Sequence, residues 1–199
     1  MIEHYTEMDR LVLERWSDVI GLIEAQRVAQ DQIEVTLGVA GERILRWVRE
    51  RGFEGEMSPR DGELWVWRPS WYDKRKAVAK VYFALGGLCP IGFRKVEDSY
   101  PYLWVCTYPL EDFKKKESER VKFAQALRVA LGDQAREWED TDIEDANFPL
   151  GRHLRQYGST ERIQWLLDPN RLVEFSKEHL PALFALADTI DSELQRIAA

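Results

Sequence analysis

Three segments in the centre of the chain decide the fold: GELWVWRPSWY (62–72), KAVAKVYFALGGL (76–88) and YPYLWVCTYPL (100–110). Each is about as long as a strand, is rich in aromatic and β-branched residues, and is bounded by Gly, Pro, Asp or Ser. Half-buried antiparallel strands have this composition and these boundaries. The segments therefore predict a meander of three or four strands from about residue 62 to 108.

Alternation along the predicted strands makes both faces of the sheet apolar. Leu64 and Val66 point to one face of the first strand, and Trp65 and Trp67 point to the other. The segments 76–88 and 100–110 alternate in the same way between two apolar sets. Such a sheet needs cover on each side, or it keeps one aromatic face open for a ligand.

Helices are predicted before the sheet. A first amphipathic helix covers about residues 5–26, and a second opens at Asp31 and ends near Gly52. Gly38 and Gly41 weaken the second helix or permit close contact with a neighbour. The stripe of the first helix consists of Val12, Trp16, Val19 and Ile23, and that of the second of Ile33, Leu37, Ile44 and Val48. Because Leu11, Leu13, Ile20 and Leu22 widen the first stripe, we expect this helix to pack on a partner or on a second copy.

The segments after the second helix and after the sheet are expected to be turns and further helices. Residues 53–60 are predicted as a polar turn, 91–96 as a further short strand, and 137–145 as an exposed acidic loop closed by 148–151. A helix is expected to follow Pro109 and to end at Gly132, with three lysines at 114–116 in its first turns. Asp168 caps the next helix, with proline after it, and Pro181 opens the last.

These elements predict the α+β class: a central three- to four-stranded antiparallel sheet flanked by N-terminal and C-terminal helices. With 199 residues the chain is long enough for one sizeable core. Residues 1–52 are expected to form an N-terminal helical segment, a possible dimerisation or partner-binding arm. Residues 53–199 are expected to form the α+β domain.

Charge is spread unevenly around a net value of −7. Residues 1–61 have 8 Lys and Arg against 13 Asp and Glu, residues 62–132 have 13 against 8, and residues 133–199 have 7 against 14. The basic centre could bind a polyanion, or the acidic flanks of the chain itself could neutralise it. No stretch is long and apolar enough for a membrane span or a secretion signal, so a cytoplasmic location without membrane contact is expected.

Sequence motifs typical of catalytic, phosphate-binding or metal-binding sites are not found. The sequence has no glycine-rich phosphate loop, no serine nucleophile elbow, and no Cys or His pair at metal-ligand spacing. We therefore predict no catalytic residue, no metal and no cofactor, and we favour a non-enzymatic protein; the alternative is an enzyme whose site is assembled only by folding. Cys89 and Cys106 are expected to be buried free thiols, and the three histidines surface or capping residues.

An aromatic and basic cluster is the candidate binding site. It consists of Trp65, Trp67, Arg68, Trp71, Lys74, Arg75 and Lys76. Single-stranded nucleic acids and sugars stack on rings that have cations beside them. The alternative is that these tryptophans fill the layer between the sheet and its helices, because large aromatic side chains bury the most area.

A family resemblance rests on the placement of the aromatic residues and on the tail. The Trp-rich strand, Phe83-Ala84-Leu85, Gly92-Phe93 and the closing Leu183-x-x-Leu186-x-x-x-Ile190-Asp191 resemble the accessory C-terminal region of bacterial PD-(D/E)XK nuclease-superfamily proteins. The likeness covers roughly residues 60–195. The catalytic Glu-x-Lys is missing, since Lys80 follows Val78 and Ala79, so no catalytic residue is carried over. The resemblance implies an accessory module of a bacterial or phage nucleic-acid system without nuclease activity.

Three functions from different classes follow. The first is a non-enzymatic interaction or regulatory domain that binds a protein partner or itself through the N-terminal helix. The second is binding of single-stranded nucleic acid through the basic, Trp-rich centre. The third is an enzyme whose site assembles only in the folded chain. Exposure of Trp65 and Trp67 discriminates between the first two.

Overall fold

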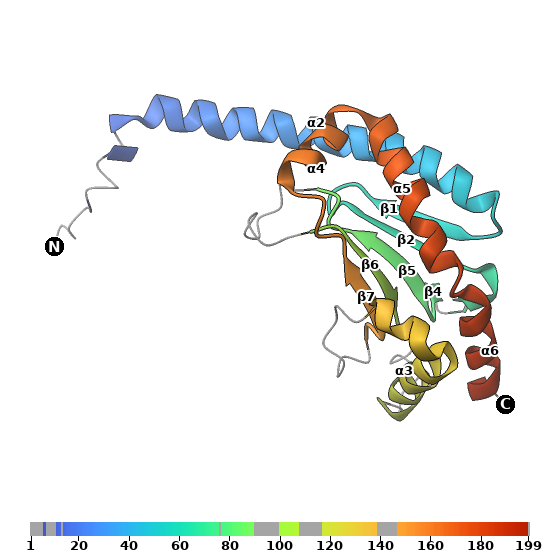
Figure 1. Cartoon of the computed structure of the whole chain (residues 1–199). Helices are drawn as coiled ribbons and strands as arrows, with labels where there is room; N and C mark the ends of the chain where they lie inside the picture. Colours follow the sequence, from blue (N-terminus) through green and yellow to red (C-terminus); the bar gives the residue numbers. More distant parts are fainter. Residues whose placement is uncertain are drawn as a thin grey trace.

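The computed structural model describes residues 6, 11–12, 14–75, 77–89, 100–107, 117–138 and 147–198 (Figure 1). The helices are α2 (Trp16–Arg49), α3 (Glu117–Leu131), α4 (Ser159–Leu167), α5 (Pro169–Phe184) and α6 (Ala187–Ala198), with short 3-10 helices η1 (Pro69–Trp71) and η4 (Gly132–Trp138). The strands are β1 (Glu54–Ser58), β2 (Glu63–Trp67), β3 (Tyr72–Asp73), β4 (Val78–Ala79), β5 (Tyr82–Gly86), β6 (Tyr102–Cys106) and β7 (Leu150–His153). The α+β prediction is confirmed.

The main sheet of the described residues is antiparallel throughout, in the order β1-β2-β5-β6-β7. Leu85 on the central strand β5 pairs with Leu64 on β2 at one side and with Leu103 on β6 at the other. Strands β3 and β4 form a separate two-stranded sheet. The predicted meander is therefore present, with the second segment broken into β4 and β5.

The sheet has five strands in the described part of the chain, where three or four were predicted. Strand β1 lies in the segment predicted as a polar turn, and β7 lies where Phe148–Gly151 was expected to close the acidic loop. Both are edge strands of the sheet. Edge strands carry polar and charged side chains because one of their sides is not paired, so Glu54 and Glu56 conceal the strand pattern of β1.

Helices α2 and α5 run along the same side of the sheet (Figure 1). The core between them and the sheet includes Ile44 of α2, Leu183 of α5 and the paired residues Val66 and Phe83, all of which are buried. The Phe184 ring of α5 stacks on Phe53 with centroids 4.2 Å apart. This face is therefore covered by helices, as the apolar set with Leu64 and Val66 predicts.

The two predicted N-terminal helices are one continuous helix, α2. Its buried residues begin at Ile33 and continue to Val48, so this half belongs to the common core. A side chain at Gly41 would overlap Met57 of β1, whereas Gly38 has open space around it. Gly41 thus permits close packing of α2 on β1, and this packing offsets the low helix propensity of glycine. The N-terminal half of α2 extends beyond the sheet (Figure 1).

The C-terminal predictions hold in part. The Asp168 side chain accepts a hydrogen bond from the Asn170 backbone N–H over 3.0 Å and caps α5, as predicted. Pro181 does not open the last helix; it lies in the last turn of α5, and α6 begins at Ala187. The predicted strand at 91–96 and the lysines at 114–116 lie outside the described residues, and α3 gives the helix expected before Gly132.

Two glycine substitutions test the close packing of β1 against β2 and α2. An added Cβ at Gly55 would lie 2.5 Å from the Trp65 carbonyl oxygen and 3.0 Å from Leu45 of α2. We expect Gly55→Ala to lower the free energy of unfolding by about 1–3 kcal/mol, the usual cost of overpacking. The control Gly38→Ala adds a methyl group in open space within a helix and should raise it by about 0.5–1 kcal/mol. Urea unfolding curves that shift in the same direction for both variants would contradict this packing.

Candidate functional site

The sheet face opposite α2 and α5 carries a layer of aromatic rings. The central strand β5 presents Ala84 and Gly86 on this face, and Ala84 pairs with Trp65 on one side and Trp104 on the other. A Cβ at Gly86 would overlap the Tyr102 ring, so this ring lies directly over the glycine. Large rings on the neighbouring strands β2 and β6 therefore cover the small residues of the central strand.

The ring layer has two clusters that share one carboxylate. In the first cluster, Trp65 packs edge-on against Tyr82 with centroids 6.3 Å apart. In the second, Tyr102 stacks on Trp104 at 4.1 Å. Glu63 accepts a hydrogen bond from the Trp65 indole N–H over 3.1 Å and another from the Tyr102 hydroxyl. This pair of hydrogen bonds fixes the two clusters relative to each other.

A cavity of about 260 Å³ opens within the first cluster, and we call it the ring pocket. It is lined by Glu56, Trp65, Trp67, Tyr72, Ala77, Val78, Ala79 and Tyr82. The Tyr72 ring, from the small β3–β4 sheet, stacks on Trp67 at 5.8 Å with 21° between the planes. Trp65 and Trp67, two of the predicted binding residues, thus lie together on an open-sided cavity rather than between the sheet and the helices.

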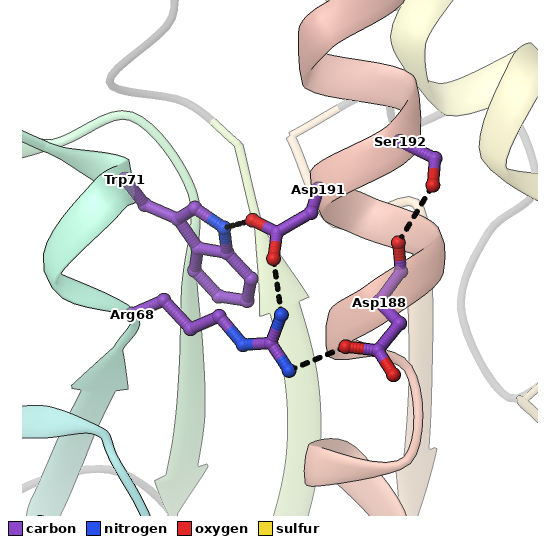
Figure 2. Close-up of polar contacts among 5 residues, drawn as sticks. All are labelled: Arg68, Trp71, Asp188, Asp191 and Ser192. Carbon is purple, nitrogen blue, oxygen red and sulfur yellow. Dashed lines mark hydrogen bonds and ion pairs between the residues drawn. The ribbon is translucent and has the colours of Figure 1, made fainter.

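Two other predicted binding residues are engaged inside the protein (Figure 2). Trp71 is 1% exposed, packs edge-on against Phe83, and donates its indole N–H to Asp191 of α6 over 2.5 Å. Arg68 forms ion pairs with Asp191 and, at 2.6 Å, with Asp188. Trp71 therefore fills the core as the alternative interpretation of the tryptophans proposes, and Arg68 anchors α6 to the sheet.

The remaining basic residues of the cluster lie in the turn between β3 and β4. Lys74 and Arg75 are exposed, and the Arg75 backbone N–H donates to the Asp73 carboxylate over 2.9 Å. Lys76 lies outside the described residues. The structure thus divides the predicted cluster into pocket residues, internal residues and an exposed turn.

Sequence reasoning missed Glu56, Tyr72 and Tyr82 as pocket residues. Tyr72 directly follows Trp71 but belongs to a separate two-residue strand, which no periodicity could reveal. Tyr82 alternates with Phe83 along β5, so the sheet face with Trp65 and Trp67 could have identified it. Glu56 was missed because the sequence predicts a turn at residues 53–60, where the structure has strand β1.

The Cys106 thiol and the Tyr102 hydroxyl, on the face of the sheet that carries the rings, both have raised pKa values. Burial raises the pKa of the Cys106 thiol above its ordinary value, although a hydrogen bond with Tyr82 acts in the opposite direction. Burial and then the hydrogen bond to Glu63 raise the pKa of Tyr102. A thiol and a phenol with raised pKa values are poor nucleophiles at neutral pH. Cys89 and Cys106 are both free thiols; Cys106 is buried and Cys89 is half-buried.

Among the described residues, no three His, Cys, Asp or Glu side chains gather in a metal-binding arrangement. In the same part of the chain, no helix is long and apolar enough to cross a membrane. His179 is a core residue, not the surface or capping residue that was predicted. It is 8% exposed, and its Nε2 lies 3.0 Å from the Tyr157 hydroxyl.

The projecting part of α2 is the second candidate surface. Residues 16–32 precede the first buried residue of the helix, and we call them the arm. Large apolar side chains on it are open to solvent: Trp16 is 53%, Leu22 72% and Ile23 54% exposed. Contiguous exposed apolar surface of this kind marks interaction sites in soluble proteins.

The anchoring of α6 gives a prediction on stability. In Asp191→Ala the buried Trp71 N–H loses its acceptor and Arg68 loses one of its two carboxylates, which should lower the free energy of unfolding by about 1–3 kcal/mol. Asp188→Ala is the matched control: this side chain is 90% exposed, so its loss should cost less than about 1 kcal/mol. Chemical denaturation of both variants checks the difference, and equal losses would contradict the role of the Trp71 N–H.

The buried imidazole gives a prediction on pH. Burial lowers the pKa of His179, against the opposing effect of Glu178. Below about pH 6.5 the unfolded chain therefore binds more protons at this residue than the folded chain does, so acidification lowers the free energy of unfolding. His179→Gln removes the titration, and urea unfolding at about pH 7 and about pH 5 should show a smaller loss on acidification than in the wild type. An unchanged pH dependence would contradict this origin.

No protein-family model, curated protein or solved structure matches the chain.

Proposed function

We propose that this chain is an interaction module that associates with a second copy of itself through the arm of α2. The observation that carries the proposal is a row of exposed apolar side chains on a helix that leaves the body of the protein (Figure 1). At 1.5 Å per residue the arm is about 25 Å long, which is ample for helix pairing. An isolated helix of this length is marginal in water, so a packing partner would stabilise it.

The spacing of the apolar positions favours pairing between helices. The stripe consists of Val12, Trp16, Val19 and Ile23, separated by steps of four and three residues. The same steps continue through Gln26 and Gln30 to Ile33, where the buried half of α2 begins. Such spacing is the heptad pattern of paired helices, and polar residues at its core positions fix the register.

A second copy is the partner that this surface suits best. The same stripe on two chains can meet across a twofold axis, so it needs no other complementary surface. Ile20 and Leu22 flank the stripe and widen it, which increases the area that pairing can bury. The arm carries three acids and one base, Asp18, Glu24, Asp31 and Arg27, a small net charge that opposes association weakly. We expect a buried contact of at least about 1,000 Å² in total.

The regulatory role expected from the resemblance stays a prediction. If the chain is an accessory module of a nucleic-acid system, the paired arms would present two copies of the α+β body to one target. Two linked copies bind a target with two matching sites far more tightly than one copy does.

Substitution of one stripe residue tests the proposal. We expect the wild type to sediment as a dimer of the 23.3 kDa chain at high micromolar concentration, and Ile23→Lys to sediment as a monomer. The same variant should lose helical circular dichroism from the arm, because an unpaired helix of this length frays.

The control is Val28→Lys, which places the same charge at another exposed β-branched residue, 63% exposed, on the opposite side of the helix. It should remain a dimer. A monomeric wild type at high micromolar concentration would overturn self-association. Equally strong dimerisation of the two lysine variants would show that the contact lies elsewhere.

A further inference from the structure

We propose that the ring pocket binds an organic cation of the methylated-ammonium class. This inference is independent of the arm, since it concerns the opposite face of the sheet. Its starting point is the composition of the cavity wall: four aromatic rings and one carboxylate among the described residues that line it. Aromatic faces attract cations through the ring quadrupole, most strongly where water is partly excluded.

The rings are held in place before any ligand arrives. Trp67 and Tyr72 stack on each other at 5.8 Å, and Trp65 and Tyr82 pack at 64° with centroids 6.3 Å apart. They come from three strands, β2, β3 and β5, of two different sheets. Because the walls are fixed by these contacts, binding costs little reordering of side chains.

Negative charge lies at the same place. Glu56 lines the pocket, and its cross-strand partner is Trp65. Glu54, two residues earlier on the same face of β1, pairs with Trp67. Neither carboxylate forms an ion pair or a side-chain hydrogen bond with another described residue. Glu56 is therefore free, within the described part of the chain, to balance the charge of a bound cation, whereas Glu54 does not line the cavity.

The two indole N–H groups of the pocket are not exposed to bond an anion or a sugar. The Trp65 N–H is already bonded to Glu63, and the Trp67 N–H is buried and has no hydrogen-bond partner among the described residues. The Tyr82 hydroxyl is engaged with Cys106. A methylated ammonium needs no donors, because π faces and a carboxylate satisfy it.

The size of the cavity selects a head group. Its volume of about 260 Å³ is below the roughly 300–1,000 Å³ of pockets that enclose a drug-sized ligand. A trimethylammonium group fits, with the rest of the ligand extending into solvent. The exposed Lys74 and Arg75 do not line the cavity.

The first measurement uses choline as the probe and the full chain as the receptor. We expect choline to shift the indole N–H resonances of Trp65 and Trp67, assigned from Trp→Phe variants, with a millimolar dissociation constant. The neutral carbon analogue of choline, in which carbon replaces the quaternary nitrogen, should bind at least about fivefold more weakly. Equal binding of the two would overturn the proposal, because burial of apolar surface alone would then explain it.

The variants form a matched pair. Glu56→Gln should weaken choline binding by about threefold to tenfold, whereas Glu54→Gln makes the same change of charge on the same strand outside the pocket and should weaken it less than about twofold. Tyr72→Leu removes one wall and should weaken binding by at least about fivefold. Equal effects of the two glutamine variants would show attraction to the general surface charge and overturn the site.

Two sources of the cation are then separated. A peptide with trimethyllysine that binds at least about tenfold more tightly than free trimethyllysine would identify a methylated protein as the ligand, and equal binding would identify a small quaternary amine. Adenosine monophosphate that shifts the same indole resonances when choline does not would replace the proposal with nucleobase stacking. The monomeric Ile23→Lys variant should bind choline as the wild type does, so failure of the arm and failure of the pocket are distinguishable.

Discussion

The structure depends on covering a sheet that is apolar on both faces, and α2 and α5 cover one of them. The face of Leu64 and Val66 is buried beneath these two helices, as in an ordinary two-layer α+β protein. On the other face, aromatic rings cover the apolar surface in the described part of the chain. Trp65, Trp104 and Tyr102 lie beside or over the alanine and glycine of β5. Aromatic side chains suit this role because each covers a large area and can keep a polar atom bonded at its edge.

Cover by rings differs from cover by a helix in one consequence. The strand spacing fixes where each ring begins, and here the rings from neighbouring strands leave a gap. Where the β3–β4 sheet meets this face, Tyr72 stacks on Trp67 and leaves a cavity beside Trp65. Ala77 adopts a φ of +52° in the turn that forms part of the wall, a conformation that non-glycine residues rarely take. The pocket thus depends on how the ring layer is built.

The sequence predicts what depends on local periodicity. The alternation in 62–67 and 102–106, the cap at Asp168 and the class of the fold all follow from residues close in the chain. It does not predict β1 or β7, whose polar residues resemble a turn because they are edge strands. Nor does it predict the continuity of α2, in which Gly41 packs against Met57 across the interface. The predicted binding cluster is also divided by contacts between residues that are distant in the sequence. Asp191, some 120 residues away, accepts hydrogen bonds from Trp71 and Arg68 and holds both inside the protein. No local pattern reveals that contact.

Strand β1 connects the two surfaces that we propose. Met57 faces α2 and packs at Gly41, while the preceding residue, Glu56, lines the ring pocket on the opposite side. Because successive side chains of a strand point to opposite faces, the residue that contacts α2 and the residue that lines the pocket are neighbours in the sequence. Helix formation is cooperative, so pairing of the arms would also stabilise the half of α2 that packs on β1.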